Sequence, residues 1–134
     1  MRVVMDTNVL VSGLLTPFGL CGRILNLVIS GEITLCVDAR ILIEYEEVLK
    51  RPKFKTNPVL IETLLDFIES CSEAYSTTPL KNSLTDPDDN PFLEVAIASH
   101  SDCLTTGNLK HFHEELRCGV TIISPRDLFD LLNS

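Results

Sequence analysis

The amino-acid sequence predicts an α/β protein with a parallel sheet. Short runs of apolar, often β-branched residues alternate with helical patterns from one end of the chain to the other, as in βαβ units. The predicted strands are apolar along their whole length, which is typical of a sheet that helices cover on both faces. A chain of 134 residues has the length of one domain, and we expect residues 1–134 to fold as one.

Local signals place each element in order. The expected strands are residues 2–5, 33–37, 74–77, 103–105 and 120–123, and the expected helices are residues 20–29, 40–51, 59–72, 92–100 and 125–132. Gly31 ends the first helix, and Pro52 stops the second. Pro58 opens the third helix, while Ser124 and Pro125 begin the last one. A polar loop over residues 78–91 precedes the fourth helix, whose apolar sequence predicts burial.

Composition limits the possible settings and functions. Five cysteines, odd in number and without a CxxC pair, indicate reduced thiols in a cytoplasmic protein. We see no signal peptide, and no apolar run is long enough to span a bilayer, so we expect no membrane contact. The net charge of −8 argues against nucleic-acid binding unless bound cations cancel part of it, because phosphate recognition normally leaves a basic footprint.

Polar residues recur where predicted strands end or helices begin. Asp6 follows the buried run Val3-Val4-Met5, and Glu44, Asp89 and Asn108 occupy similar places further along. Because the carboxyl ends of parallel strands meet at one edge of a sheet, these side chains can converge. A carboxylate at the end of a buried strand is costly without a positive partner, and a divalent cation is the usual one.

Each of these residues also has a local explanation. Asp6 can cap a helix or form an Asx turn, and Glu44 can be a solvated residue beside the apolar stripe of its helix. Asp89 is a natural cap before Pro91, and Asn108 after Gly107 suits a tight turn. The three carboxylates of Asp86, Asp88 and Asp89 repel one another, which favours a cation nearby.

Four motifs together resemble the PIN-domain ribonucleases, and within them the toxin components of toxin–antitoxin systems. The motifs are Val4 to Ser12 (VMDTNVLVS), Ile43 to Phe54 (IEYEEVLKRPKF), Asp86 to Ala96 (DPDDNPFLEVA) and Leu104 to Leu109 (LTTGNL), and they cover nearly the whole chain in the family's order. The resemblance implies a three-layer α/β/α fold around a parallel sheet of about five strands. It also implies a ribonuclease that uses Mg²⁺ or Mn²⁺.

The resemblance assigns roles to individual residues. Asp6, Glu44 and Asp89 would be the catalytic acids and metal ligands, with Asp86 as an alternative ligand. Asn108 stands where the family usually has Asp, so a carbonyl ligand remains but one charge is lost. Thr7, Asn8, Ser12 and Thr106 would orient the ligands or touch the substrate. The expected partners are an RNA substrate, an antitoxin protein and a second copy of the chain.

Positive charge gathers in residues 50–55, which we call the basic segment. Its cations Lys50, Arg51, Lys53 and Lys55 either complement the end of a helix or contact the RNA backbone.

Three other functions compete with a metal-dependent ribonuclease. A PIN-like domain could be inactive and bind only RNA or a protein, as the neutral Asn108 suggests. Asp6 could be the nucleophile of a phosphoryl-transferring hydrolase, but the second Asp of those enzymes is replaced by Asn8. A zinc site built from Cys103, His111, His113 or Cys118 fits no common spacing, and Phe112 is expected to pack inward.

Overall fold

The computed structural model describes residues 1–133, which contain one five-stranded sheet. The strands are β1 (Arg2–Met5), β2 (Thr34–Val37), β3 (Glu73–Ala74), β4 (Cys103–Thr105) and β5 (Ile122–Ile123). All neighbouring strands pair in parallel, in the order β3-β2-β1-β4-β5. The predicted parallel sheet of about five strands is therefore confirmed. The last expected positions of the third strand were wrong, because β3 is a two-residue edge strand that begins at Glu73.

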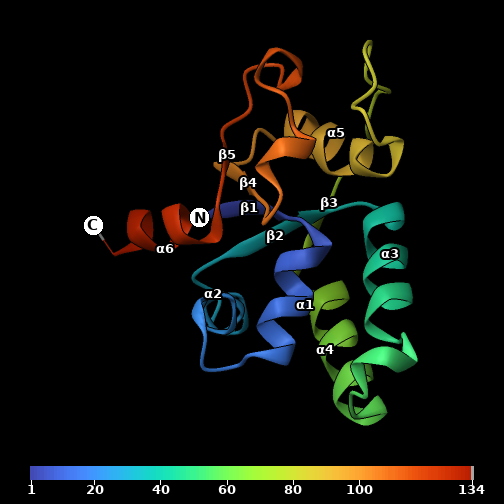
Figure 1. Ribbon diagram of the computed structural model, residues 1–134, viewed down its shortest axis with the longest axis vertical. Helices are drawn as coiled ribbons and strands as arrows, with labels where there is room; N and C mark the ends of the chain where they lie inside the picture. Colours follow the sequence, from blue (N-terminus) through green and yellow to red (C-terminus); the bar gives the residue numbers. More distant parts are fainter. Residues whose placement is uncertain (134) are drawn as a thin grey trace.

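Helices cover both faces of the sheet. They are α1 (Thr7–Leu15), α2 (Leu20–Ile29), α3 (Ala39–Leu49), α4 (Pro58–Cys71), α5 (Asn90–Ser99) and α6 (Pro125–Leu132), with short 3₁₀ turns η1 (Pro52–Phe54), η2 (Pro87–Asp89), η3 (Leu109–His111) and η4 (Glu114–Leu116). Figure 1 shows the sheet between α5 on one side and α1, α2 and α4 on the other. The predicted three-layer α/β/α arrangement is confirmed, and α5 is buried as expected, with Phe92, Leu93 and Val95 in the core.

Helix α1 is the element that sequence reasoning missed. Its sequence is rich in β-branched residues and contains Ser12 and Gly13, which are weak helix formers. Tertiary packing overrides this low propensity, because Val9 and Leu10 are buried in the core beneath the sheet. The helix begins immediately after Asp6, so the carboxylate lies at the junction between β1 and α1.

Close packing holds α2 beside α1. A Cβ atom at Gly22 would lie 2.2 Å from the carbonyl oxygen of Pro17, and one at Gly13 would lie 2.9 Å from the carbonyl oxygen of Cys21. Neither position has room for a side chain. Among residues 1–133, no single helix has the length and apolar character of a membrane span; only α1 and α2 taken together, with a 101° bend between them, satisfy that criterion.

The strand order places a topological switch point between β1 and β4. The chain leaves β1 toward β2 and β3 on one side, and later crosses back to β4 and β5 on the other. Open parallel sheets bind ligands at such a switch point, outside the carboxyl ends of the strands. Met5 pairs with Thr105 across this boundary, and the amide of Asp6 donates to the carbonyl of Thr105 at 2.9 Å. Asp6 and Thr106 therefore emerge side by side.

Candidate functional site

Asp6 is buried at the end of β1 and is only 6% exposed. It occupies the N-cap position of α1, yet its side chain makes no capping hydrogen bond. The carboxylate instead accepts hydrogen bonds at Oδ2 from the Thr106 hydroxyl at 2.7 Å and from Asn8 Nδ2 at 3.5 Å. Burial raises the pKa of Asp6, although the Thr106 hydroxyl, the Thr7 amide and the charge of His111 partly offset this effect. Asp6 therefore holds the predicted N-cap position, but its side chain does not make the capping bond.

Glu44 is brought to the same edge by its neighbour on α3. The buried Tyr45 hydroxyl donates to the carbonyl of Met5 at 2.5 Å, which ties α3 to the end of β1. The Thr7 hydroxyl donates to Glu44 Oε2. Burial raises the pKa of Glu44, and the charge of Asp6 raises it further, while Arg51 lowers it. Glu44 is thus half-buried beside Asp6 rather than a freely solvated surface acid.

Asp89 reaches the edge from η2, immediately before α5, and is 9% exposed. Its Oδ2 atom lies 3.1 Å from Nδ1 of His111. Burial and the nearby charge of Asp6 raise the pKa of Asp89 to about 6, against the opposing effect of His111. Asp86, the predicted alternative ligand, is exposed and accepts a hydrogen bond from the Asp88 amide at 3.0 Å. Asp86 therefore caps the η2 turn in this structure.

The loop after β4 carries the remaining predicted residues. The Asn108 amide donates to the Thr106 hydroxyl at 3.0 Å, and the Gly107 amide donates to Asn8 Oδ1 at 3.1 Å. Thr106 and Asn8 therefore hold this loop and orient Asp6 at the same time. Ser12 is exposed on α1, and with Asn8 and Asn108 it lines a cavity of about 230 Å³ beside the loop.

The fold thus gathers three carboxylates that are far apart in the sequence. We call Asp6, Glu44 and Asp89 the acidic site. The charge of Asp6 acts on both of the other two, so the three groups share one electrostatic environment. Among residues 1–133, Asp6 has no ion pair, and the His111 side chain, which contacts Asp89, acts on it through its charge.

Comparison with known proteins identifies the fold family. A family model described as a PIN domain matches residues 2–110, which include the whole acidic site and Asn108. The chain belongs to the PIN domain family. An uncharacterized protein of Methanocaldococcus jannaschii is 33% identical over 107 residues, which are 78% of this chain and 69% of that protein. The predicted family is therefore confirmed, and it is one whose members are generally nucleases that typically use divalent metal ions.

The donor atoms of this PIN domain suit a hard divalent cation, although they are not arranged as a closed cage. Among residues 1–133, no group of three or more His, Cys, Asp or Glu side chains is placed to hold a metal ion. Mg²⁺ is usually bound through one or two carboxylates, with water and substrate phosphate as the other ligands. Within residues 1–133 the buried Asp6 has no ion pair, and Asp89 beside it has only His111, so the site has room for the charge of such a cation.

His111 is a site residue whose place sequence reasoning missed. We weighed it only as a zinc ligand, whereas in the structure its Nδ1 contacts Asp89 Oδ2 and its charge acts on Asp6. The available signal was its position three residues after Asn108, inside the loop that follows β4. Phe112 is fully buried, as predicted, and this turns His111 toward the acidic site.

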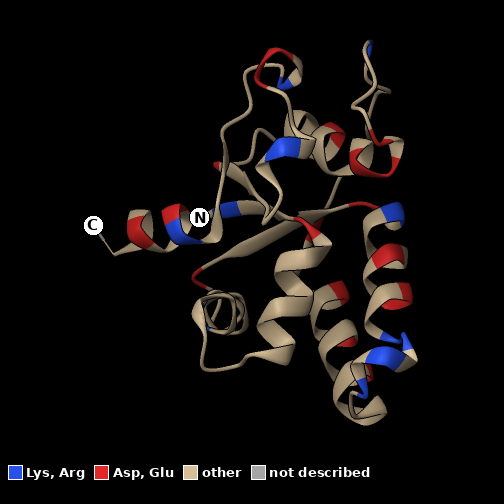
Figure 2. Ribbon diagram, viewed as in Figure 1, with Lys and Arg blue, Asp and Glu red and all other residues tan. Residues whose placement is uncertain are grey.

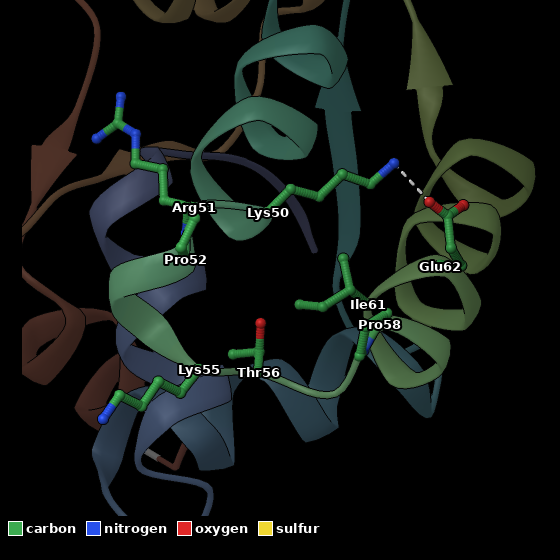
Figure 3. A pocket seen from close by; sticks show the side chains of 8 residues that line it. All are labelled: Lys50, Arg51, Pro52, Lys55, Thr56, Pro58, Ile61 and Glu62. Carbon is green, nitrogen blue, oxygen red and sulfur yellow. Dashed lines mark ion pairs between the residues drawn. The ribbon is translucent and has the colours of Figure 1, made fainter.

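The basic segment lies at the junction of α3, η1 and α4, where Figure 2 shows a basic group below the acidic helix α3. A cavity of about 430 Å³ opens there, lined among others by Lys50, Thr56 and Ile61. Figure 3 shows Lys50 reaching across it to Glu62, and the Nζ–Oε1 distance is 2.5 Å. Lys50 also lies 3.7 Å from Glu46. No carboxylate of the acidic site lines this cavity, and of the segment's cations only Arg51 acts on Glu44.

Proposed function

We propose that this PIN-domain protein is a metal-dependent ribonuclease that hydrolyses RNA phosphodiesters at the acidic site. The observation that carries the proposal is the buried Asp6 carboxylate, which faces the charges of Asp89 and Glu44 without an ion pair of its own. A buried acid in that position is expensive to ionise unless the site binds a cation. A family that consists generally of nucleases supplies the reaction class.

The residues of the site would divide the work. Asp6 and Asp89 would hold Mg²⁺ or Mn²⁺, with Glu44 contributing directly or through water. When bound, the cation lowers the pKa of a water molecule and stabilises charge on the phosphate oxygens. Thr106 and Asn8 hold the Asp6 carboxylate in place, and Thr7 does the same for Glu44. Outer partners of this kind fix the orientation and basicity of ligands.

Asn108 is the departure from the family's usual acid. It offers a neutral carbonyl in place of a carboxylate, which weakens the attraction for a second cation more than for the first. The proposal therefore favours one tightly bound cation at Asp6 and Asp89. Isothermal titration of the metal-free protein with Mn²⁺ measures the number of sites, and two sites of equal affinity would contradict this assignment.

The decisive experiment compares cleavage with and without metal. Wild-type protein and Asp6→Asn are incubated with a panel of single-stranded and structured RNAs in EDTA, Mg²⁺ and Mn²⁺. The wild type is expected to cleave only with a divalent metal, and Asp6→Asn to be inactive in every condition. Cleavage that continues in EDTA, or that survives Asp6→Asn, would sink the mechanism. Tyr45 and Thr106 remain in both proteins, so the fold around the site is matched.

The biological role follows from the resemblance to toxins. The protein would act in the cytoplasm as the toxin of a toxin–antitoxin pair, as a homodimer that an antitoxin protein inhibits. Induced expression should then arrest growth, and expression of Asp6→Asn should not. Light scattering after gel filtration tests the dimer separately, because a monomer would remove that part of the proposal and leave the nuclease.

A non-catalytic PIN domain is the second candidate, and Asn108 is the observation that favours it. Such a protein would bind RNA or a protein partner without cleaving. It predicts RNA binding that is equal in EDTA and Mn²⁺, together with no heat of Mn²⁺ binding and no product from the whole RNA panel. Detectable Mn²⁺-dependent cleavage that Asp6→Asn abolishes would rule it out.

A further inference from the structure

A groove adjoins the acidic site on the side of α1, α2 and α6. It consists of two cavities of about 620 Å³ and 230 Å³ that share Cys21, Gly107, Asn108 and Pro125 in their walls. The loop between β4 and η3 forms one wall, and the first residues of α2 and α6 form the other. We call this feature the groove.

Two residues that line the groove also bond the proposed catalytic carboxylate. Thr106 lines the larger cavity and Asn8 lines the smaller one. Both side chains donate hydrogen bonds to Asp6 Oδ2, at 2.7 Å and 3.5 Å. A polymer lying in the groove would therefore contact Thr106 and Asn8, the two side chains that bond Asp6.

The charge of the groove is opposite to that of the acidic site. Its larger cavity is lined by Lys110 and Arg126, and no Asp or Glu lines either cavity. Within residues 1–133 neither cation forms an ion pair. In a protein of net charge −8, a groove lined by two unpaired cations and no acid repels a polyanion less than the acidic site does.

The basic segment differs from the groove in its surroundings. Within residues 1–133 Arg51, Lys53 and Lys55 also form no ion pair, but no residue that bonds Asp6 lines the cavity of the basic segment. Lys50 is already held by Glu62 and Glu46, and Glu62 lines the same cavity. An incoming phosphate there would compete with these carboxylates for Lys50, whereas at Lys110 and Arg126 it would not.

We propose that a single RNA strand runs through the groove, with the phosphates next to the scissile one bound by Lys110 and Arg126 rather than by the basic segment. The apolar side chains of Leu20, Leu109 and Pro125 in the groove wall would lie against unpaired bases, which a duplex does not expose. The strand's identity as the substrate rests on the ribonuclease function proposed above, but its binding does not require cleavage.

The test measures binding with cleavage switched off. A fluorescently labelled, unstructured RNA is titrated with protein in EDTA at several salt concentrations. The double variant Lys110→Gln/Arg126→Gln should raise Kd several-fold and reduce the slope of log K against log salt by about 1.4, since each lost contact to single strands contributes about 0.7. The matched control Lys53→Gln/Lys55→Gln removes the same charge and should change both quantities little. Equal effects of the two variants, or a larger effect of the control, would overturn the proposal.

A thiol probe locates the strand directly. Cys21 lines both cavities of the groove. The exposed Cys71 and Cys118 line neither of them, and Cys118 lies in a separate cavity. In a Cys71→Ser/Cys118→Ser background, saturating RNA should slow alkylation of Cys21, and the groove double variant should lose this protection at the same RNA concentration. An unchanged alkylation rate with RNA bound places the strand elsewhere and refutes the proposal.

The two proposals fail separately. Groove-dependent binding without Mn²⁺-dependent cleavage would keep the groove and remove the nuclease. Cleavage that the groove variant performs with wild-type Kd and rate would keep the nuclease and remove the groove. Unfolding curves of both double variants serve as the check on folding, and all four substituted side chains are exposed.

Discussion

Two buried carboxylates in this protein, Glu94 and Asp6, are equally hidden and differently surrounded. Each is 6% exposed. Glu94 on α5 has a cation, because Arg40 Nη1 lies 2.8 Å from its Oε1, and the Leu80 amide donates to its other oxygen at 3.2 Å. Asp6 has hydroxyl and amide donors but no ion pair, and a second buried acid lies in its electrostatic reach.

The difference separates a structural acid from a candidate catalytic one. Burial removes solvation from both groups, and for Glu94 the Arg40 side chain offsets that cost within the chain. Within residues 1–133 no cation forms an ion pair with Asp6, so this cost is not offset. A buried acid whose compensation must come from outside the chain is a reason to expect a ligand there, while a buried acid with its own Arg is not.

Asp6→Asn should have the largest effect, and it tests whether Asp6 is a catalytic or a structural acid. We expect RNA cleavage to fall by more than the roughly 10–100-fold that is typical of losing an outer partner of a metal ligand. The free energy of unfolding should stay the same or rise, because the change removes a buried charge and keeps the acceptor for Thr106. Single-turnover kinetics and urea unfolding measure the two quantities. A variant that loses both activity and stability would make Asp6 a structural residue.

Glu94→Gln should show the opposite pattern. Loss of the charged partner of Arg40 is expected to cost about 1–3 kcal/mol of unfolding free energy, at the lower end because Arg40 is half-exposed and keeps Asp38. Mn²⁺ affinity should not change, since Glu94 lies outside the acidic site. The matched control is Glu62→Gln, whose pair with Lys50 is exposed and screened by solvent, so that its loss should change the unfolding free energy much less. Equal losses in the two variants would mean that burial of Glu94 adds nothing.

The raised pKa of Asp89 should make the stability of the protein depend on pH. Its folded pKa of about 6 lies above the ordinary value of 3.8, so the folded protein binds the proton more tightly between these values. Without metal, wild-type stability should therefore fall relative to Asp89→Asn as pH rises from about 4 to about 6, and level off above. Urea unfolding in EDTA across this range measures the difference. A constant difference, or one that grows in the opposite direction, would show that Asp89 is not desolvated as described.

His111→Gln should have the smallest effect. We expect Mn²⁺ affinity to fall roughly tenfold, because the variant loses the ring nitrogen that contacts Asp89 and sets its orientation. His113→Gln is the control, since His113 is exposed two residues away and makes no contact with the acidic site in the described structure. Calorimetric titration of both variants measures the affinities. If His113→Gln weakens binding as much, the effect belongs to the whole loop and not to the His111–Asp89 contact.

Much of the fold could be predicted because its signals are local. The strands at residues 2–5 and 103–105 and the stops at Gly31 and Pro52 were placed from composition and turn chemistry, and the structure confirms them. Helix α1 could not be predicted, since most of its residues are weak helix formers and packing in the core and against α2 favours the helix. The predicted bounds of β3 were wrong for a related reason. This edge strand extends only as far as it pairs with β2, and local sequence does not show that pairing.

Local sequence was enough to predict that polar residues follow the strands, and the four motifs predicted the PIN family. Which acids have a cationic partner depends on the three-dimensional fold. Asp6, Asp89 and Glu94 are all acids beside apolar runs, and nothing in their spacing distinguishes them. Arg40 reaches Glu94 across 54 positions of the chain, while Asp6 meets Thr106 from 100 positions away and no cation. Compensation of a buried charge depends on distances in space, which local sequence does not contain.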